Sequence, residues 1–504
     1  MNYTNPIISG FYPDPSICRV EDDFYMVTST FEYFPGVPIF HSKDLVNWKQ
    51  IGHCLTTKEQ LPLEKTGSSG GVFAPTIRYH NGRFYMITTN VSHKGNFFVW
   101  AEKPEGPWSD PVWLNEWPGI DPSLFFDDDG TVYITGTREG VQAPHGIYQA
   151  TLDIVTGKLL SDRQLIWEGT GAAEPEGPHL YKIDGYYYLL ISEGGTEYGH
   201  MVVAARSEYP FGPFESYEDN PILSHRSLKS PIQGTGHSDL IQFTDGSWWA
   251  VFLAYRPIGY FPKHHLGRET FLAPVQWTDD GWPIFGDNGK VTVEMEAPHL
   301  DTPQSTDWEE LDDFNKDSLG MKWNYRRNPI KSNYSLTKNE GWLSLKGAAA
   351  TLSEPESHTF VGRRQEHFDC AVSTLLSFNP DEGEEAGLTV YANEQYHYDV
   401  ALMKEKGQKS VLFRKTVGSL CLIEKRLPYT DEELTLKVKA DETTYTFSVT
   451  DSSGKTTELG IGECGFLSKE VAGGFTGVYF GLYATGNGKE STNEASFDWF
   501  KYSI

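Results

Sequence analysis

Residues 14–27 read DPSICRVEDDFYMV, and variants of this stretch recur four more times within the first 255 residues. The other copies read APTIRYHNGRFYMI at 74–87, DPSLFFDDDGTVYI at 121–134, EGPHLYKIDGYYYL at 176–189 and HSDLIQFTDGSWWA at 237–250. Each has a small polar cluster, an apolar strand, a tight turn and an aromatic-rich strand. Asn-Gly or Asp-Gly forms the turn in four copies, and these dipeptides tolerate the positive φ of a two-residue hairpin. The repeat therefore predicts five β-hairpins.

The spacing of the hairpins predicts the architecture of the first domain. The aligned aromatic residues Tyr25, Tyr85, Tyr133, Tyr188 and Trp249 are separated by 60, 48, 55 and 61 residues. Each interval has room for about four short strands, which is the content of one propeller blade. We therefore expect a five-bladed β-propeller over residues 1–297.

The residue pattern of the sequence changes after the fifth copy of the repeat. Residues 298–307 are polar and proline-containing, as expected of a linker. Beyond them come short alternating runs, such as GWLSLK at 341–346, separated by turns. This pattern is typical of an all-β sandwich of the concanavalin or jelly-roll kind, expected over residues 308–504. The sandwich carries no catalytic constellation, so we expect it to buttress the propeller or, as the alternative, to bind sugar.

Charge and composition exclude several classes of partner. The formal net charge of −27 disfavours nucleic acid and anionic membranes, whose phosphates need clustered Lys and Arg, and it favours a small neutral substrate. No apolar run reaches the roughly 18 residues of a membrane span, and the first residues do not resemble a signal peptide. Five scattered cysteines without metal-ligand spacing indicate reduced thiols, so we expect a cytoplasmic protein.

The repeat also places ionisable residues. The leading residue of each copy stands 11 or 12 positions before the aligned aromatic, so the five leading residues hold equivalent places at the start of each first strand. These residues are Asp14, Ala74, Asp121, Glu176 and His237. Because first strands line the axis of a propeller, we expect the four ionisable ones to converge at one mouth of the central channel.

Three carboxylates at one axis are the set that glycosidic bond cleavage needs. One acid protonates the leaving oxygen, and a second carboxylate activates a water if configuration inverts. A third can raise the pKa of the acid by like-charge repulsion. A single Asp-Pro-Ser would indicate only a turn, but crowded carboxylates are costly to desolvate, so their repetition favours function. Glu174 lies close to Glu176 and can share its face, so the choice of Glu176 rests on register with the repeat.

At these residues the sequence resembles glycoside hydrolase family 43, in its β-xylosidase and α-L-arabinofuranosidase branch. The resemblance rests on NPIISGFYPDPS at 5–16, YFPGVPI at 33–39, SKDLVNW at 42–48, DPSLF at 121–125, EGPH at 176–179, HSD at 237–239 and GRET at 267–270. It covers nearly the whole chain, and the C-terminal region is similar to the β-sandwich appended in this branch.

The resemblance implies roles for these residues. Asp14 corresponds to the general base, Asp121 to the carboxylate that modulates the pKa, and Glu176 to the general acid. His237 and Arg268 correspond to pocket residues. The chemistry then needs no cofactor, although some members hold a structural calcium ion near the axial histidine. His237 is therefore a candidate metal residue, with a purely hydrogen-bonding histidine as the alternative.

The resemblance also bears on substrate and assembly. It implies an inverting exo-glycosidase that releases terminal xylose from short oligosaccharides, with α-L-arabinofuranose as the alternative sugar, and it implies a homo-oligomer. Phe73 stands before Ala74 where β-xylosidases of the branch often have Trp, so both residues are assigned to the sugar subsite together with Phe31. Phe31 can instead be an ordinary packing residue. Whether a sandwich loop near Phe475 closes the pocket stays open at this point.

Two other functions fit the same repeat. A retaining propeller glycosidase acting on fructosides would use a nucleophile in place of the base, and the anomer first formed distinguishes it. A non-catalytic glycan-binding propeller would bind sugar without turnover, but the three axial acids speak against it.

Overall fold

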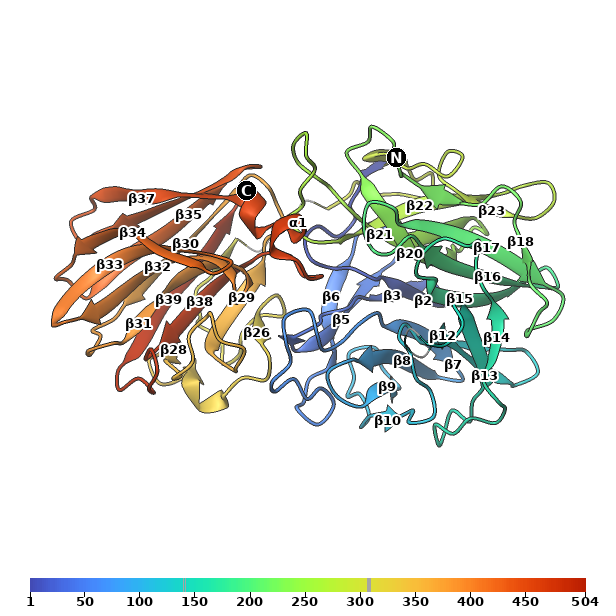
Figure 1. Cartoon of the computed structure of the whole chain (residues 1–504), viewed down its shortest axis with the longest axis horizontal. Coiled ribbons are helices and arrows are strands. Elements are labelled where there is room, and N and C mark those ends of the chain that lie inside the picture. The colour runs from blue at the N-terminus through green and yellow to red at the C-terminus, as the bar shows by residue number, and fades with distance from the viewer. Residues whose placement is uncertain (139, 141, 306–309) are drawn as a thin grey trace.

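The computed structural model describes residues 1–138, 140, 142–305 and 310–504, and it shows two all-β domains that lie next to each other (Figure 1). The first domain consists of five antiparallel sheets, and the first strand of each contacts the first strands of its two neighbours. This closed ring is a five-bladed β-propeller, and the second domain is a β-sandwich. The predicted fold class is confirmed.

Each blade runs outward from its axial strand. In chain order the blades comprise β2 (Ser16–Val20), β3 (Asp23–Val27), β5 (Gly36–Ser42) and β6 (Lys49–Leu55); β7 (Thr76–His80), β8 (Arg83–Asn90), β9 (Gly95–Ala101) and β10 (Val112–Trp113); β11 (Ser123–Phe126), β12 (Val132–Thr137), β13 (Ile147–Thr151) and β14 (Gln164–Trp167); β15 (Glu176–Ile183), β16 (Tyr186–Glu193), β17 (Met201–Ser207), β18 (Glu215–Ser216) and β19 (Leu223–Ser224); and β20 (Gln233–Gln242), β21 (Trp248–Tyr255), β22 (Glu269–Trp277) and β23 (Pro283–Phe285). The five predicted hairpins are the first two strands of each blade.

The N-terminal segment ties the domain together. Strand β1 (Asn2–Thr4) pairs with β24 (Glu294–Glu296), and Ile8 bridges to Thr270 in the last blade. The first residues are thus held against the last part of the propeller. Of the predicted linker, residues 298–305 contain no strand or helix, and 306–307 lie outside the described residues.

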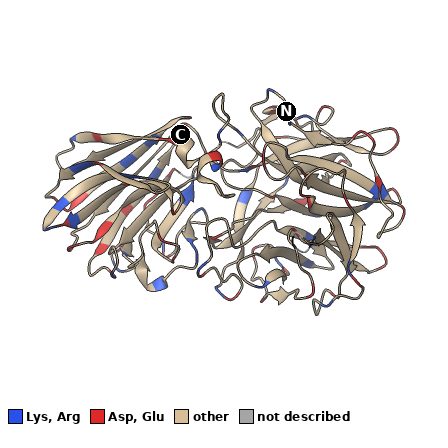
Figure 2. Cartoon of the chain, viewed as in Figure 1, with Lys and Arg blue, Asp and Glu red and all other residues tan. Residues whose placement is uncertain are grey.

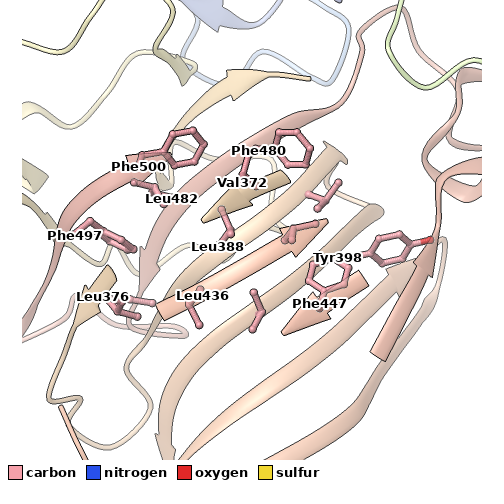
Figure 3. Close-up of a cluster of buried hydrophobic side chains, with 14 of the residues drawn as sticks. Val372, Leu376, Leu388, Tyr398, Leu436, Phe447, Phe480, Leu482, Phe497 and Phe500 are labelled. Atoms are coloured by element: carbon pink, nitrogen blue, oxygen red, sulfur yellow. The ribbon is translucent and has the colours of Figure 1, made fainter. Parts of the chain in front are cut away.

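The sandwich consists of two antiparallel sheets that enclose one apolar core. One sheet contains β27 (Tyr334–Ser335), β28 (Leu343–Lys346), β39 (Glu494–Ser503), β30 (Cys370–Ser377), β35 (Glu433–Ala440), β36 (Thr444–Thr450) and β37 (Thr456–Glu463), with β25 (Leu311–Asp312) also on β39. The other contains β34 (Leu420–Pro428), β33 (Gln408–Val417), β32 (Tyr396–Glu405), β31 (Glu385–Asn393), β38 (Tyr479–Thr485), β29 (Thr359–Arg364) and β26 (Asn324–Arg326). Inward side chains such as Val372, Leu376 and Phe480 alternate with outward ones along these strands, as in other sandwiches, and fill the space between the sheets (Figure 3).

The two domains share a sheet. Strand β4 (Tyr33–Phe34) comes from the propeller half of the sequence, yet it pairs with β26 and so extends the second sandwich sheet. The Tyr33 ring stacks on Tyr479 with centroids 4.0 Å apart. The short helix α1 (Lys469–Ala472) also lies at the junction (Figure 1). Because backbone pairing crosses the boundary, the sandwich is fixed against the propeller.

The surface carries both signs of charge. Figure 2 shows Lys and Arg interspersed with Asp and Glu over both domains. All five cysteines are free, and four of them are buried. Within the described residues, no helix has the length and apolar character needed to cross a membrane.

Candidate active site

One pocket at the propeller axis contains every residue that the sequence assigned to a site. It is lined by Asp14, Phe31, Phe73, Ala74, Ile120, Asp121, Glu176, Thr196, His237, Arg268 and Phe475. The eight predicted residues come from all five blades, and Phe475 comes from the sandwich. The repeat therefore brings together side chains that are more than 200 residues apart in sequence.

The backbone is bent at the start of most axial strands. Asp14, Asp121 and His237 adopt left-handed conformations, with φ of 56°, 53° and 46°. Such conformations cost energy outside glycine and concentrate at functional sites. In each case the bent residue stands two positions before the first regular pair of its hairpin, which is Ser16 with Val27 in the first blade.

The fourth blade also has a left-handed residue before its regular pairing, but that residue is a glycine. Its regular pairing begins at His179, so the position equivalent to Asp14 is Gly177, with φ of 58°. A β-bulge between Glu176 and His179 adds one residue, and Glu176 reaches the pocket from the position before the glycine. A Cβ on Gly177 would lie 2.9 Å from Nδ1 of His237, so only glycine fits there.

Asp14 is held as an anion. Its Oδ1 accepts a hydrogen bond from Nη1 of Arg268 at 2.9 Å, and its Oδ2 accepts one from the Ser29 hydroxyl. Burial alone would raise the pKa of Asp14, but the Arg268 guanidinium, His237 and the Ser29 hydrogen bond together outweigh it and lower the pKa below its ordinary value. Arg268 is itself buried and also donates to Oγ1 of Thr196 at 2.9 Å.

Glu176 is held as a neutral acid. Burial raises its pKa to about 7, and the negative charge of Asp14 adds to the rise, although His237 and Arg268 oppose it. Nε2 of His200 lies 3.3 Å from Oε1 of Glu176. Burial lowers the pKa of His200 to about 3, so this imidazole is neutral. Its Nδ1 faces the Gly234 carbonyl oxygen at 3.4 Å and therefore carries the hydrogen, so Nε2 can only accept a hydrogen bond from protonated Glu176.

Asp121 belongs to the same electrostatic group. Its Oδ2 accepts a hydrogen bond from the backbone N–H of Gly177 at 3.1 Å. Burial, followed among the raising causes by the charges of Glu176 and Asp14, raises its pKa. The pocket thus contains one ionised carboxylate and two whose charged forms are disfavoured.

Glu174, the competing acid, points elsewhere. Its side chain is 61% exposed and lies 3.6 Å from Arg138. It does not line the axial pocket, but it lines an adjoining one that shares Ile120 and Glu176 with it. The register argument therefore selected the carboxylate that faces the axis.

Three phenylalanines form an apolar wall over the carboxylates. The Phe31 ring lies 5.2 Å from Phe73 and 5.8 Å from Phe475, and Phe73 lies 6.0 Å from Phe475. The Arg268 guanidinium lies within 6 Å of the Phe31 and Phe475 rings. The backbone N–H of Phe475 donates to Oγ of Ser69 at 2.8 Å. The sandwich loop therefore forms part of the pocket wall, which answers the question that the sequence left open.

His237 faces the pocket in surroundings that are poor in metal ligands. Its backbone N–H donates to Oγ of Ser192 at 2.5 Å. Calcium takes about 6–8 oxygen ligands, and among the described residues no group of three His, Cys, Asp or Glu could hold a metal. The residues around His237 therefore do not fit a calcium ion held by protein side chains.

Four contributors to the site escaped the sequence analysis. Ser29, Ile120 and Thr196 follow or precede the repeated strands in loops of different length, so the repeat gives no register for them. His200 lies at the start of β17, a third blade strand, and no motif marks it. Histidine next to an acid is detectable only after the fold brings β15 and β17 of one blade together.

The geometry permits acid–base chemistry on a neutral ligand. Two carboxyl groups in one pocket whose pKa values are pushed apart act as a base and an acid respectively. Asp14 has the depressed pKa and Glu176 the raised one.

Comparisons with known proteins agree with this chemistry. Residues 3–283 match the family described as Glycosyl hydrolases family 43, and residues 311–503 match the Beta xylosidase C-terminal Concanavalin A-like domain. A non-reducing end alpha-L-arabinofuranosidase of Bacteroides ovatus is 46% identical, over 99% of this chain and 94% of the relative. A xylosidase/arabinosidase of Butyrivibrio fibrisolvens is 41% identical over 98% of both chains. The crystal structure of a xylan beta-1,4-xylosidase from Bacillus halodurans superimposes with a TM-score of 0.94 at 35% identity, over 100% of both chains.

Proposed function

The chain belongs to family 43 of the glycosyl hydrolases, and on that premise we propose that it is an inverting exo-glycosidase that releases one terminal pentose from short neutral oligosaccharides. Glu176 donates its proton to the glycosidic oxygen as the bond to the anomeric carbon breaks. Asp14 takes a proton from the water that attacks the opposite face of the sugar. Asp121 accepts the hydrogen bond of the Gly177 backbone N–H and so helps to position the segment that carries the acid.

The observation that carries the proposal is the opposed protonation of two carboxyl groups in one pocket. Arg268 and Ser29 hold Asp14 ionised, whereas burial and the charge of Asp14 keep Glu176 protonated. A base that is already ionised and an acid that is still protonated coexist between these two pKa values. No cofactor has a role in this scheme.

The size of the pocket supports removal of a single terminal residue. Its volume is about 90 Å³, well below the roughly 300–1,000 Å³ of pockets for drug-sized ligands, so it suits one small sugar unit. The Phe31, Phe73 and Phe475 rings close one side, so a chain cannot pass through.

The proposed sugars are β-xylose and α-L-arabinofuranose. Relatives that carry both names, including the xylosidase/arabinosidase of Butyrivibrio fibrisolvens, support one pocket for the two sugars. Both sugars present an apolar face and a ring of hydroxyls, which suit the phenylalanine wall and the Arg268–Asp14 pair respectively. Phe73 lines the pocket at the position where β-xylosidases of the branch often have Trp, so it is the residue that we expect to set the preference.

The stereochemical course and two matched variants test this function. With wild-type protein and paired nitrophenyl β-xyloside and α-L-arabinofuranoside, NMR should show the inverted anomer first. Glu176→Gln should lose about a hundredfold to ten-thousandfold in kcat, the contribution typical of general acid catalysis. Glu174→Gln, two residues away, should keep wild-type activity. A retained anomer, or full activity in Glu176→Gln, would contradict the proposal.

The proposal also covers the cellular location, the oligomeric state and a calcium ion. Four buried free thiols support the reducing environment of the cytoplasm. The edge strand β34 exposes Leu420, Leu422 and Ile423, and exposed apolar edges favour association, so we propose a homo-oligomer that covers this edge. Leu422→Lys should then reduce the mass measured by light scattering, and an unchanged mass would exclude this edge. A calcium ion near His237 would need water for most of its ligands and has no step in the mechanism.

A further inference from the structure

Two tryptophans of the sandwich are set apart from all the others in the described chain. Every other described tryptophan belongs to one of the hydrophobic clusters of the two domains. Trp342 and Trp499 belong to none of these clusters, and both are partly exposed. Large apolar rings that take no part in the core need another reason to be held at a surface.

A β-bulge explains how Trp499 reaches the surface. Along β39, Phe497 and Phe500 both point into the core (Figure 3), although an unbroken strand would place inward residues two positions apart. Thr374 pairs with Phe500 and Leu376 pairs with Phe497, so two residues of β39 stand opposite one residue of β30. The extra residue leaves both Asp498 and Trp499 outside the core. Bulges of this kind re-aim side chains and are frequent beside functional sites.

Within the described residues, no strand pairs with β39 at this bulge on the side away from β30. Strand β28 pairs with β39 as far as Phe497, and β25 pairs with it from Phe500 onward. Between these two short strands the sheet has a notch at Asp498 and Trp499, and Trp342 directly precedes β28. The notch opens into a pocket of about 590 Å³ lined by Leu311, Asp313, Asn315, Glu340, Gly341, Trp342, Asp498, Trp499 and Lys501.

The lining has the composition of a carbohydrate site. Two indole rings offer apolar faces for stacking, and acidic and amide side chains at the rim offer acceptors for sugar hydroxyls. The charge of the rim disfavours an anionic ligand, because Asp313, Glu340 and Asp498 outnumber the single Lys501. Partial burial and the charge of Asp313 raise the pKa of Asp498, so the carboxylates of the rim repel one another.

We propose that the notch beside the β39 bulge binds a neutral oligosaccharide, in a second sugar site separate from the active site. The two pockets have no lining residue in common. The notch lies on the sheet of β39, whereas β26 of the other sheet pairs with β4 of the propeller segment. The site therefore holds a longer substrate near the enzyme without filling the catalytic pocket. It extends the proposed function and can be tested apart from it.

Calorimetric titration with xylohexaose tests the site. The Glu176→Gln variant is used as the parent because it does not consume the ligand, and soluble arabinoxylan in native affinity gels is the second probe. Adding W342A and W499A together should remove one binding event from the isotherm, or weaken it by about tenfold or more, and should abolish retardation in the gel. The single change Trp342→Ala should have a smaller effect of the same sign.

Controls separate loss of the site from loss of the fold. When W342A and W499A are introduced into the wild type, the enzyme should keep wild-type kcat/KM on nitrophenyl glycosides. The active-site pocket is lined in part by Phe475 of the sandwich, so an unchanged kcat/KM shows that the sandwich is intact. Leu420→Ala, an exposed apolar change on the other sheet, should leave the isotherm unchanged. An isotherm and a gel mobility that are the same with and without the two tryptophans would overturn the second site, even if the glycosidase function stands.

Discussion

Replacing Arg268 by Met tests the electrostatic basis of the proposed base. Arg268 is 3% exposed and donates to Asp14 at 2.9 Å, so its removal leaves a buried carboxylate without its cationic partner. An adjacent guanidinium lowers a carboxyl pKa by about 1–3 units. We therefore expect the pKa of Asp14 to rise by about that amount, because burial is then opposed only by His237, the Ser29 hydrogen bond and His200.

The expected change in the pH profile has a definite sign. The acidic limb of kcat/KM reports the free base and the alkaline limb reports the acid. In Arg268→Met the acidic limb should move to higher pH by about 1–3 units. The alkaline limb should also move upward from about 7, because Arg268 lowers the pKa of Glu176. The measurement is kcat/KM on nitrophenyl α-L-arabinofuranoside across the pH range.

Stability gives a second, independent readout. Breaking a buried ion pair by removing one partner costs about 3–5 kcal/mol. In the wild type, the depressed pKa of Asp14 contributes stability that is present above its unfolded pKa and is lost as pH falls through the folded value. The deficit of Arg268→Met should therefore be largest near neutral pH and should shrink as acid protonates Asp14. Denaturant unfolding at two pH values measures it.

A neighbouring ion pair provides the matched control. Arg256 makes hydrogen bonds of 2.7 Å to both carboxylate oxygens of Glu269, but neither residue lines the pocket. Arg256→Met should lower stability without moving either limb of the pH profile. If the acidic limb of Arg268→Met stays where it is in the wild type, or moves equally in Arg256→Met, then Arg268 does not set the charge of Asp14.

Two further changes test the pocket wall and the register of the fourth blade. Phe475→Ala removes one ring of the pocket wall, and an apolar contact with the sugar worth about 1.4 kcal/mol corresponds to a tenfold change in affinity, so kcat/KM should fall by roughly tenfold, mainly through KM; steady-state kinetics with unchanged KM would show that the sandwich loop does not hold the sugar. Gly177→Ala places a methyl group 2.9 Å from the His237 ring in a left-handed backbone, at a conformational cost of about 1–2 kcal/mol; both the thermal unfolding temperature and kcat should fall, and a wild-type kcat would contradict the packing argument.

Most of the site was predictable from the repeat because a propeller places the equivalent positions of its blades around one axis. Asp14, Asp121 and His237 hold equivalent places at the start of axial strands, so equal spacing in sequence was enough to bring them to one mouth. Glu176 was found by the same spacing although its register differs by one residue. The turn of that blade is one residue shorter than those of the third and fifth blades and offsets the bulge, so the count of residues to the aligned aromatic is the same in these three blades.

The remaining contributors depend on contacts that a period cannot encode. His200 reaches Glu176 from a third strand, where blade twist and loop length decide which side chain faces the axis. Phe475 arrives from another domain, and its placement depends on how the sandwich docks. Trp342 and Trp499 become neighbours only because a bulge in β39 coincides with the gap between β25 and β28. Bulges leave no reliable mark in a single sequence.

The segment that carries Phe31 into the pocket also fixes how the sandwich packs on the propeller. Phe31 has a φ of 51° and is followed by Glu32, which is fully buried. The Glu32 carbonyl accepts a hydrogen bond from the Arg327 backbone N–H at 2.8 Å, and its carboxylate accepts one from Ser69 at 3.0 Å. β4 then pairs with β26. The strained turn that carries Phe31 is thus held by sandwich residues on one side and by the Ser69 loop on the other. Since Ser69 also binds Phe475, both domains are needed to build a single subsite.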